Sequence, residues 1–146
     1  MPIEEKILLH KERGEIVPTR DLLKTPAQIE MIRKSASLNT AVLDEVAKHI
    51  RVGMSTAEID KIVYDFTVEH GGIPAPLDYQ GFPKSVCTSL NNEICHGIPD
   101  ENIILHEGDI INVDVSTILD GYFSDASRMF KMGKISQRAE RLIRVT

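Results

Sequence analysis

The sequence lacks the features that mark membrane, secreted and nucleic-acid-binding proteins. No apolar run approaches the length of a membrane-spanning helix, and the first residues lack the hydrophobic region of a secretory signal. Basic residues are fewer than acidic ones, and the net charge is −5. This charge gives no electrostatic reason to expect nucleic acid or an anionic membrane as a partner. We therefore expect a cytoplasmic protein with no nucleic-acid or membrane partner.

Cysteine is also scarce, with two among 146 residues. Cys87 and Cys95 lie in apolar-flanked segments without CxxC spacing, so reduced thiols that mainly pack in the core are a better interpretation than a disulfide. With 42% hydrophobic and 27% charged residues, the chain has room for one modest core and one domain.

Two helices are predicted in the first half of the chain. Residues 1–23 are charged and weakly patterned, so we predict an N-terminal extension or arm ahead of a domain at residues 24–146. Thr25 begins a capping box with proline at the first helical position, and apolar residues then follow helical spacing toward Gly53. Ser55 begins a second capping box, and a glycine pair ends that helix. Both helices are interpreted as the cover of a sheet.

A stiff, proline-rich loop and a first hairpin are predicted between residues 73 and 99. The hairpin comprises a strand at residues 85–90, a turn, and a returning strand at residues 93–96. Tyr79 and Phe82 lie in the loop, where they can either wall a pocket or anchor the loop on the core. His96 ends the returning strand, so its side chain can point into a cleft, although a lone histidine is more often structural than catalytic.

Two aspartates, Asp114 and Asp125, lie in facing arms of a second predicted hairpin. Polarity alternates over residues 111–117, and the Asp-Gly pair at positions 120–121 is a strong two-residue turn signal. That turn pairs Ser116 with Asp125. Asp114 then becomes the diagonal neighbour of Asp125 on the same face, roughly 7 Å away between Cβ atoms.

Two carboxylates this close repel each other unless a positive group lies between them. A metal ion is therefore the leading explanation, and oxygen ligands suit Mn²⁺, Co²⁺, Fe²⁺ or Zn²⁺ without selecting among them. From the residues alone, Asp114 and Asp125 can also be solvated polar positions on an exposed sheet face.

Several runs around these positions match the pattern of one enzyme family. They are Phe82-Pro83-Lys84-Ser85-Val86-Cys87, Cys95-His96-Gly97-Ile98-Pro99, Asn112-Val113-Asp114-Val115, Asp120-Gly121-Tyr122 and Asp125-Ala126-Ser127-Arg128-Met129-Phe130. Together they closely resemble type I methionine aminopeptidases, a family of metalloproteases. The resemblance extends from about residue 23 to residue 146, and the intervals between His96, Asp114 and Asp125 fit the family pattern.

The resemblance implies an α+β, pita-bread fold, of which residues 24–146 form one half, with two helices packed on antiparallel hairpins. Family members use two divalent metal ions to hydrolyse the initiator methionine from nascent proteins, which implies proximity to the ribosome. By position, Asp114 would bind one metal and Asp125 would bridge both. His96 would contact the substrate and stabilise the transition state. Three positions match the lining of the methionine side-chain pocket: Tyr79, Phe82 and Cys87.

The sequence also departs from the family pattern. Phe82 stands where some members have tyrosine and Gln80 where some have histidine, and these changes can retune the pocket. The family's remaining ligands, a histidine and two glutamates, come from a second half that these residues do not include. We therefore expect an incomplete half that is inactive by itself. The alternative is a non-catalytic module that self-associates, or pairs with another chain, through its uncovered sheet.

Overall fold

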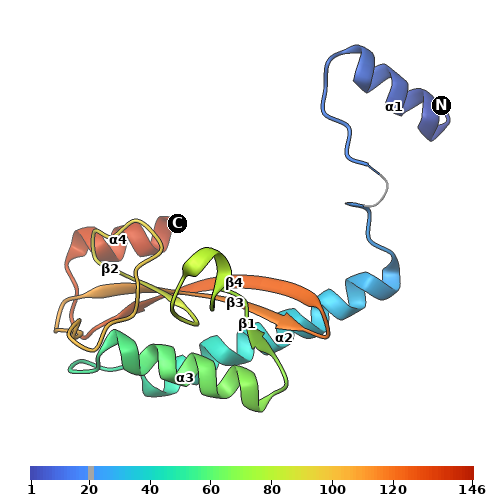
Figure 1. The fold of residues 1–146 in the computed structure, drawn as a ribbon. Helices are drawn as coiled ribbons and strands as arrows, with labels where there is room; N and C mark the ends of the chain where they lie inside the picture. Colours follow the sequence, from blue (N-terminus) through green and yellow to red (C-terminus); the bar gives the residue numbers. More distant parts are fainter. Residues whose placement is uncertain (20–21) are drawn as a thin grey trace. The chain divides into compact units, whose positions relative to one another are not determined.

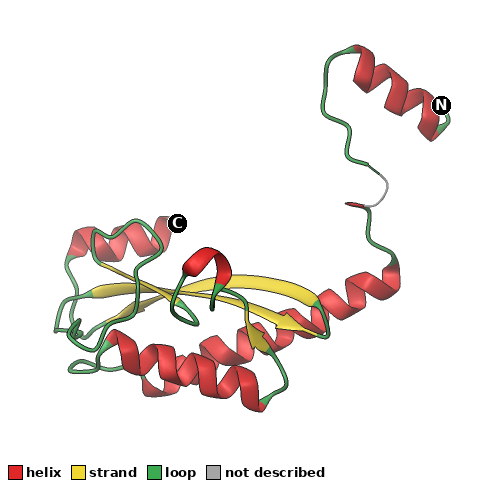
Figure 2. Ribbon diagram, viewed as in Figure 1, coloured by secondary structure: helices red, strands yellow, loops and turns green. Residues whose placement is uncertain are grey.

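The structure, a computed structural model, describes residues 1–19 and 22–146. Arg20 and Asp21, which fall in the predicted N-terminal extension, lie outside the described residues. The chain divides into two compact units, Met1–Glu30 and Met31–Thr146. Figures 1 and 2 show the elements, which in chain order are α1 (Ile3–Glu12), α2 (Pro26–His49), α3 (Thr56–Glu69), β1 (Ile73–Pro74), η2 (Tyr79–Gly81), β2 (Cys87–Leu90), β3 (Ile110–Leu119), β4 (Tyr122–Lys131) and α4 (Gln137–Val145).

The unit Met1–Glu30 contains α1, a helix with no buried residue, where the sequence predicted only a weakly patterned arm. The capping box predicted at Thr25 is confirmed. The Thr25 N–H donates to Oε1 of Gln28 at 2.8 Å, and the Gln28 N–H donates to Oγ1 of Thr25 at 3.2 Å. These reciprocal bonds satisfy backbone donors that the first turn of α2 cannot pair internally.

The second capping box is also confirmed. The Ser55 N–H donates to Glu58 Oε2 at 2.7 Å, and the Glu58 N–H donates to Ser55 Oγ at 3.2 Å. The preceding helix ends at His49, four residues before the Gly53 at which its end was predicted. Among the described residues, no helix combines the length and hydropathy that crossing a membrane requires.

β3 is the central strand of an antiparallel sheet. β4 pairs with it from Ile110↔Lys131 to Leu119↔Tyr122. β2 pairs with residues 111–114 of β3, and β1 pairs with residues 117–118. These registers place Cys87, the first residue of β2, directly opposite Asp114 in the middle of β3.

The two faces of β3 differ in burial. Ile111, Val113 and Val115 are at most 1% exposed and belong to the hydrophobic core. α2 and α3 contribute six further core residues: Leu38, Val42, Leu43, Val46, Ile59 and Val63. Figure 1 shows these two helices on one side of the sheet and α4 on the other. Three polar residues of β3 lie on the face away from the core and are half-buried: Asn112, Asp114 and Ser116. The predicted α+β arrangement, with two helices on an antiparallel sheet, is therefore confirmed.

The prediction of the first hairpin is wrong for its returning strand. β2 forms, but residues 93–96 are not a strand, and β2 pairs with β3 instead. Asn91 and His96 have φ values of 52° and 58°, which interrupt any extended conformation between them. The segment meets β2 again at Gly97, whose carbonyl accepts from the Thr88 N–H at 2.8 Å.

Polar side chains of α2 bind the core side of the β3–β4 hairpin. Asn39, only 1% exposed, donates from Nδ2 to the Val115 carbonyl at 2.7 Å. Ser35 is fully buried, and its Oγ lies 2.8 Å from Oγ of Ser124 on β4. A buried polar group is costly unless it is hydrogen-bonded, so these bonds favour one position of the helix on the hairpin.

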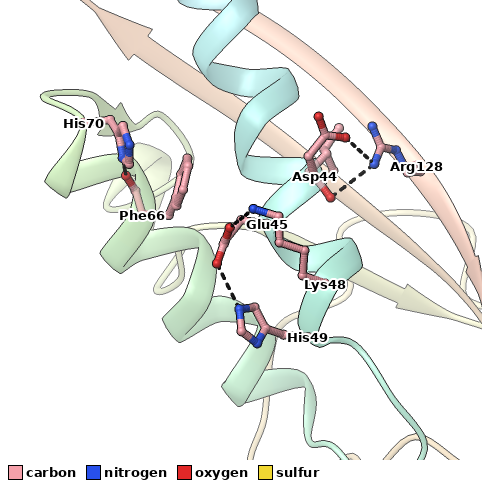
Figure 3. A network of polar contacts seen from close by, with 8 residues as sticks. Asp44, Glu45, Lys48, His49, Phe66, His70 and Arg128 are labelled. Atoms are coloured by element: carbon pink, nitrogen blue, oxygen red, sulfur yellow. Dashed lines mark hydrogen bonds and ion pairs between the residues drawn. The ribbon is translucent and has the colours of Figure 1, made fainter.

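A second link between α2 and β4 lies nearer the surface. Arg128 of β4 forms an ion pair with Asp44 at 2.9 Å and donates to the Leu43 carbonyl at 3.3 Å. Figure 3 shows this pair beside a separate surface cluster, in which Glu45 accepts from side chains one turn further along α2. Exposed pairs of this kind contribute about 1 kcal/mol or less to stability.

Candidate functional site

The register predicted for the β3–β4 hairpin is confirmed. Asp120 and Gly121 form its two-residue turn with φ values of 51° and 81°, the positive angles that such a turn requires. Leu119 therefore pairs with Tyr122, and Ser116 faces Asp125. Because side chains alternate between faces along a strand, this register places the carboxylate of Asp125 on the same face as Asp114.

The two aspartates have different surroundings on that face. Asp125 is exposed, and its Oδ1 accepts a hydrogen bond from Oγ of Ser116 at 2.7 Å. Asp114 is half-buried between Cys87 on β2 and Ser127 on β4, its partners in the two ladders. Among the described residues, neither carboxylate takes part in an ion pair.

Burial and like charge both act on Asp114. Burial raises the pKa of its carboxyl group above the ordinary value, the negative charge of Asp125 raises it further, and His96 acts in the opposite direction. Burial, followed by the charge of Asp114, likewise raises the pKa of the Cys87 thiol to about 11. A cation between the aspartates would relieve their mutual repulsion, which is the second cause of the raised pKa of Asp114.

The chemistry of the donors fits a divalent metal ion. Carboxylate oxygens are hard ligands, and the carboxylates of Asp114 and Asp125 belong to residues that line one cavity. No group of three or more His, Cys, Asp or Glu side chains within the described ranges, 1–19 and 22–146, is arranged to hold a metal. Asp114 and Asp125 could therefore supply two ligands to a metal ion, which is fewer than a complete set.

His96 reaches the site from the irregular segment that replaces the predicted returning strand. It is exposed, with a left-handed backbone conformation at φ 58°. The next residue, Gly97, is buried against β2, where an added Cβ would lie 2.1 Å from the Thr88 carbonyl oxygen. This close approach anchors the backbone beside the sheet and lets the imidazole lie at the cavity.

All six residues singled out from the sequence line one cavity of about 860 Å³. They come from η2 and the loop after it, from β2, from the segment before Gly97, and from β3 and β4. Tyr79 is 66% exposed at the cavity, so it does not anchor the loop in the core, whereas Phe82 is half-buried. The six residues are Tyr79, Phe82, Cys87, His96, Asp114 and Asp125.

Other residues of the cavity were not predicted. Ser116 and Phe123 line it, and both lie two positions from an aspartate along the same strand. The predicted register had already placed Ser116 opposite Asp125, although it was not named as a site residue, and the same alternation could have identified Phe123. Ile98 lines the cavity and follows Gly97 in the matched run, but no local pattern indicated its orientation.

The prediction for the cysteines is partly wrong. Both thiols are free, as expected. However, Cys87 is half-buried at the cavity and Cys95 is exposed, so neither is a fully buried core residue. Cys95 is exposed because residues 93–96 leave the sheet and do not form the predicted strand.

Comparisons with known proteins agree with this geometry. The model of metallopeptidase family M24 matches residues 30–146. Methionine aminopeptidase A of Synechocystis is 49% identical over 119 residues, which cover 82% of this chain and 47% of the relative. Methionine aminopeptidase of Escherichia coli is 45% identical over 125 residues, covering 85% of this chain and 47% of the relative.

A solved structure supports the same relationship. The crystal structure of methionine aminopeptidase from Rickettsia prowazekii superposes with a TM-score of 0.83 at 40% identity, covering 85% of this chain and 50% of that one. The pita-bread fold expected from the resemblance is thereby confirmed. The chain spans about half the length of the relatives it matches. It belongs to metallopeptidase family M24, and within that family it is similar to methionine aminopeptidases.

Proposed function

We propose that the protein contributes one wall of a methionyl aminopeptidase site, which removes the initiator methionine from new proteins with the help of divalent metal ions. The observation that carries this proposal is the convergence of His96, Asp114 and Asp125 on one cavity of about 860 Å³. Similarity to methionine aminopeptidases over most of the chain supports the choice of substrate.

Asp114 and Asp125 would hold the metal ions through their carboxylates. A bound divalent ion acts as a Lewis acid and provides a nucleophile from water at neutral pH. Mn²⁺, Co²⁺, Fe²⁺ and Zn²⁺ all suit oxygen ligands of this kind. The half-buried position of Asp114 strengthens its interaction with a cation, because fewer water molecules screen the charge.

His96 would donate a hydrogen bond to the substrate at the bond to be cleaved, where negative charge develops. Its neighbour Gly97 holds the backbone against β2, which keeps the imidazole at the cavity. The substrate's methionine side chain would lie against Tyr79, Phe82 and Cys87, since a thioether packs favourably on ring edges.

The first test is metal binding, measured by isothermal titration with Mn²⁺. In a chimera in which residues 31–146 replace the corresponding half of the Escherichia coli relative, the ion should bind, and Asp114→Asn and Asp125→Asn should each weaken that binding. Asp120→Asn is the matched control, because it removes a carboxylate from the turn of the same hairpin and asparagine tolerates positive φ. Equal binding by all four proteins would contradict the assignment.

The second test is turnover in a chimera. Residues 31–146 would replace the corresponding half of the Escherichia coli relative, and release of methionine from a Met-Ala-Ser peptide would be measured. We expect metal-dependent release, lost with Asp114→Asn or Asp125→Asn and retained with Asp120→Asn. A folded chimera without activity, or with near-normal activity after either substitution at the site, would refute the proposal.

A further inference from the structure

We propose that Ser116 is a positioning residue for Asp125, which fixes the direction of its carboxylate toward the metal ions; this inference rests on the proposed function. Ser116 faces Asp125 across the β3–β4 ladder. Its hydroxyl group donates to Oδ1 of Asp125 at 2.7 Å, within the normal range for such a bond to a carboxylate.

The hydrogen bond leaves the other carboxylate oxygen available. An ionised carboxylate can accept about four hydrogen bonds or ligand contacts, and Ser116 occupies one position on Oδ1. Oδ2 has no hydrogen-bond partner within the described part of the chain. The bond to β3 restricts the side chain of Asp125 where it lines the cavity, and Oδ2 is left without a competing hydrogen bond from the described residues.

Asp125 needs this support more than Asp114 does. Asp114 is half-buried between two neighbouring strands, which restrict its rotamers by packing. Asp125 is exposed on the outer strand, where packing alone leaves its side chain free to rotate. Ser127, which faces Asp114 on the same side of the hairpin, makes no such hydrogen bond in the described residues, so the two aspartates are held by different means.

The backbone that carries Ser116 is itself held on both sides. The Ser116 carbonyl accepts from the Ala75 N–H at 2.9 Å. On the core side, Asn39 donates to the Val115 carbonyl at 2.7 Å, and Ser35 donates to the Thr117 carbonyl at 3.2 Å. A donor on a well-fixed strand restricts its acceptor more than a donor on a loop does, because the donor itself cannot follow the acceptor's motion.

The first experiment measures the side-chain rotamer of Asp125 without metal, from the NMR couplings between its α and β protons. The wild-type protein should show a single rotamer, and Ser116→Ala should show averaged couplings. Ser116→Thr retains the hydroxyl group and should restore the single rotamer. Ser127→Ala, which removes a hydroxyl group that makes no hydrogen bond on the same face, should leave the couplings unchanged. A single rotamer in Ser116→Ala would overturn the inference.

The second experiment measures Mn²⁺ affinity by isothermal titration in the chimera with the Escherichia coli half, and the wild type is the chimera with Ser116 unchanged. Ser116→Ala should bind Mn²⁺ roughly tenfold or more weakly than the wild type, because loss of an outer-shell partner typically costs about 10–100-fold in metal affinity. Ser116→Thr should bind within about threefold of the wild type. Equal affinity of Ser116→Ala and the wild type would refute the positioning role while leaving the proposed function intact. Absence of Mn²⁺ binding by the chimera with Ser116 unchanged would instead overturn the proposed function and the metal-directed role with it.

Discussion

At the scale of single residues, the site depends on a few backbone conformations that only particular residue types adopt readily. The turn at Asp120-Gly121 fixes which residues of β4 face β3. A slip of one residue would turn Asp125 toward the core side, because the side-chain period of a strand is two. The two-residue turn lies outside the cavity, yet it determines that Asp114 and Asp125 are on the same face of the hairpin.

Gly97→Ala should destabilise the protein by about 1–3 kcal/mol, the usual range for an atom forced into a filled space. The added Cβ would meet the Thr88 carbonyl oxygen at 2.1 Å, so the segment carrying His96 would have to move away from β2. Urea denaturation of Gly97→Ala measures the loss of unfolding free energy relative to the wild type. Cys95→Ala, an exposed position two residues earlier, should leave the midpoint nearly unchanged. Equal stability of the two variants would show that the backbone yields at Gly97 without cost.

At the scale of elements, the capping boxes determine where the covering helices begin. Ser55→Ala should destabilise the protein by about 0.5–2 kcal/mol, since the buried hydroxyl group caps the Glu58 N–H. Chemical denaturation provides the measurement. Ser37→Ala is a suitable control, because Ser37 is exposed within α2 and bonds only to the carbonyl one turn before it. Comparable losses in both variants would argue against a specific role for the cap.

The same cap predicts a pH dependence. The Ser55 N–H holds the pKa of Glu58 below its ordinary value of 4.5. A carboxyl group with a lowered folded pKa stabilises the folded state above the unfolded pKa, and that stabilisation is lost as pH falls through the folded pKa. The difference in unfolding free energy between wild type and Glu58→Gln should therefore be present at pH 7 and shrink below about pH 4.5. A difference that is the same at pH 7 and pH 3 would contradict this origin.

At the scale of the whole molecule, the unit Met31–Thr146 has one core between its sheet and the helices α2 and α3. Ile59 is fully buried in that core, whereas Ile94 is 94% exposed near the site. Ile59→Ala should cost about 2–5 kcal/mol through lost contacts and the cavity left behind. Ile94→Ala should change the unfolding free energy by less than about 0.5 kcal/mol. Thermal or urea unfolding of the two variants tests the contrast, and a small effect at Ile59 would show that the core relaxes around the cavity.

The sequence by itself determined those features that depend on neighbours in the chain. Capping boxes at Thr25 and Ser55 and the register of the β3–β4 hairpin follow from turn chemistry and from periods of 3.6 and 2 residues. The shared face of Asp114 and Asp125 follows from the same arithmetic. The chain around His96, Tyr79 and Phe82 indicated that these side chains can lie at a cleft or pocket. The family resemblance added the roles expected of them and of Cys87.

Only the tertiary structure decided which distant segments meet. β2 could have paired with residues 93–96 or with β3, and local propensity does not distinguish these partners. Pairing with β3 placed Cys87 beside Asp114, left Cys95 exposed, and allowed the segment before Gly97 to carry His96 into the cavity. The hydrogen bond from Ser116 to Asp125 likewise appears only once both strands and their side-chain rotamers are defined. Such contacts depend on the packing of the complete core, which is a property of many residues together and not of any short run.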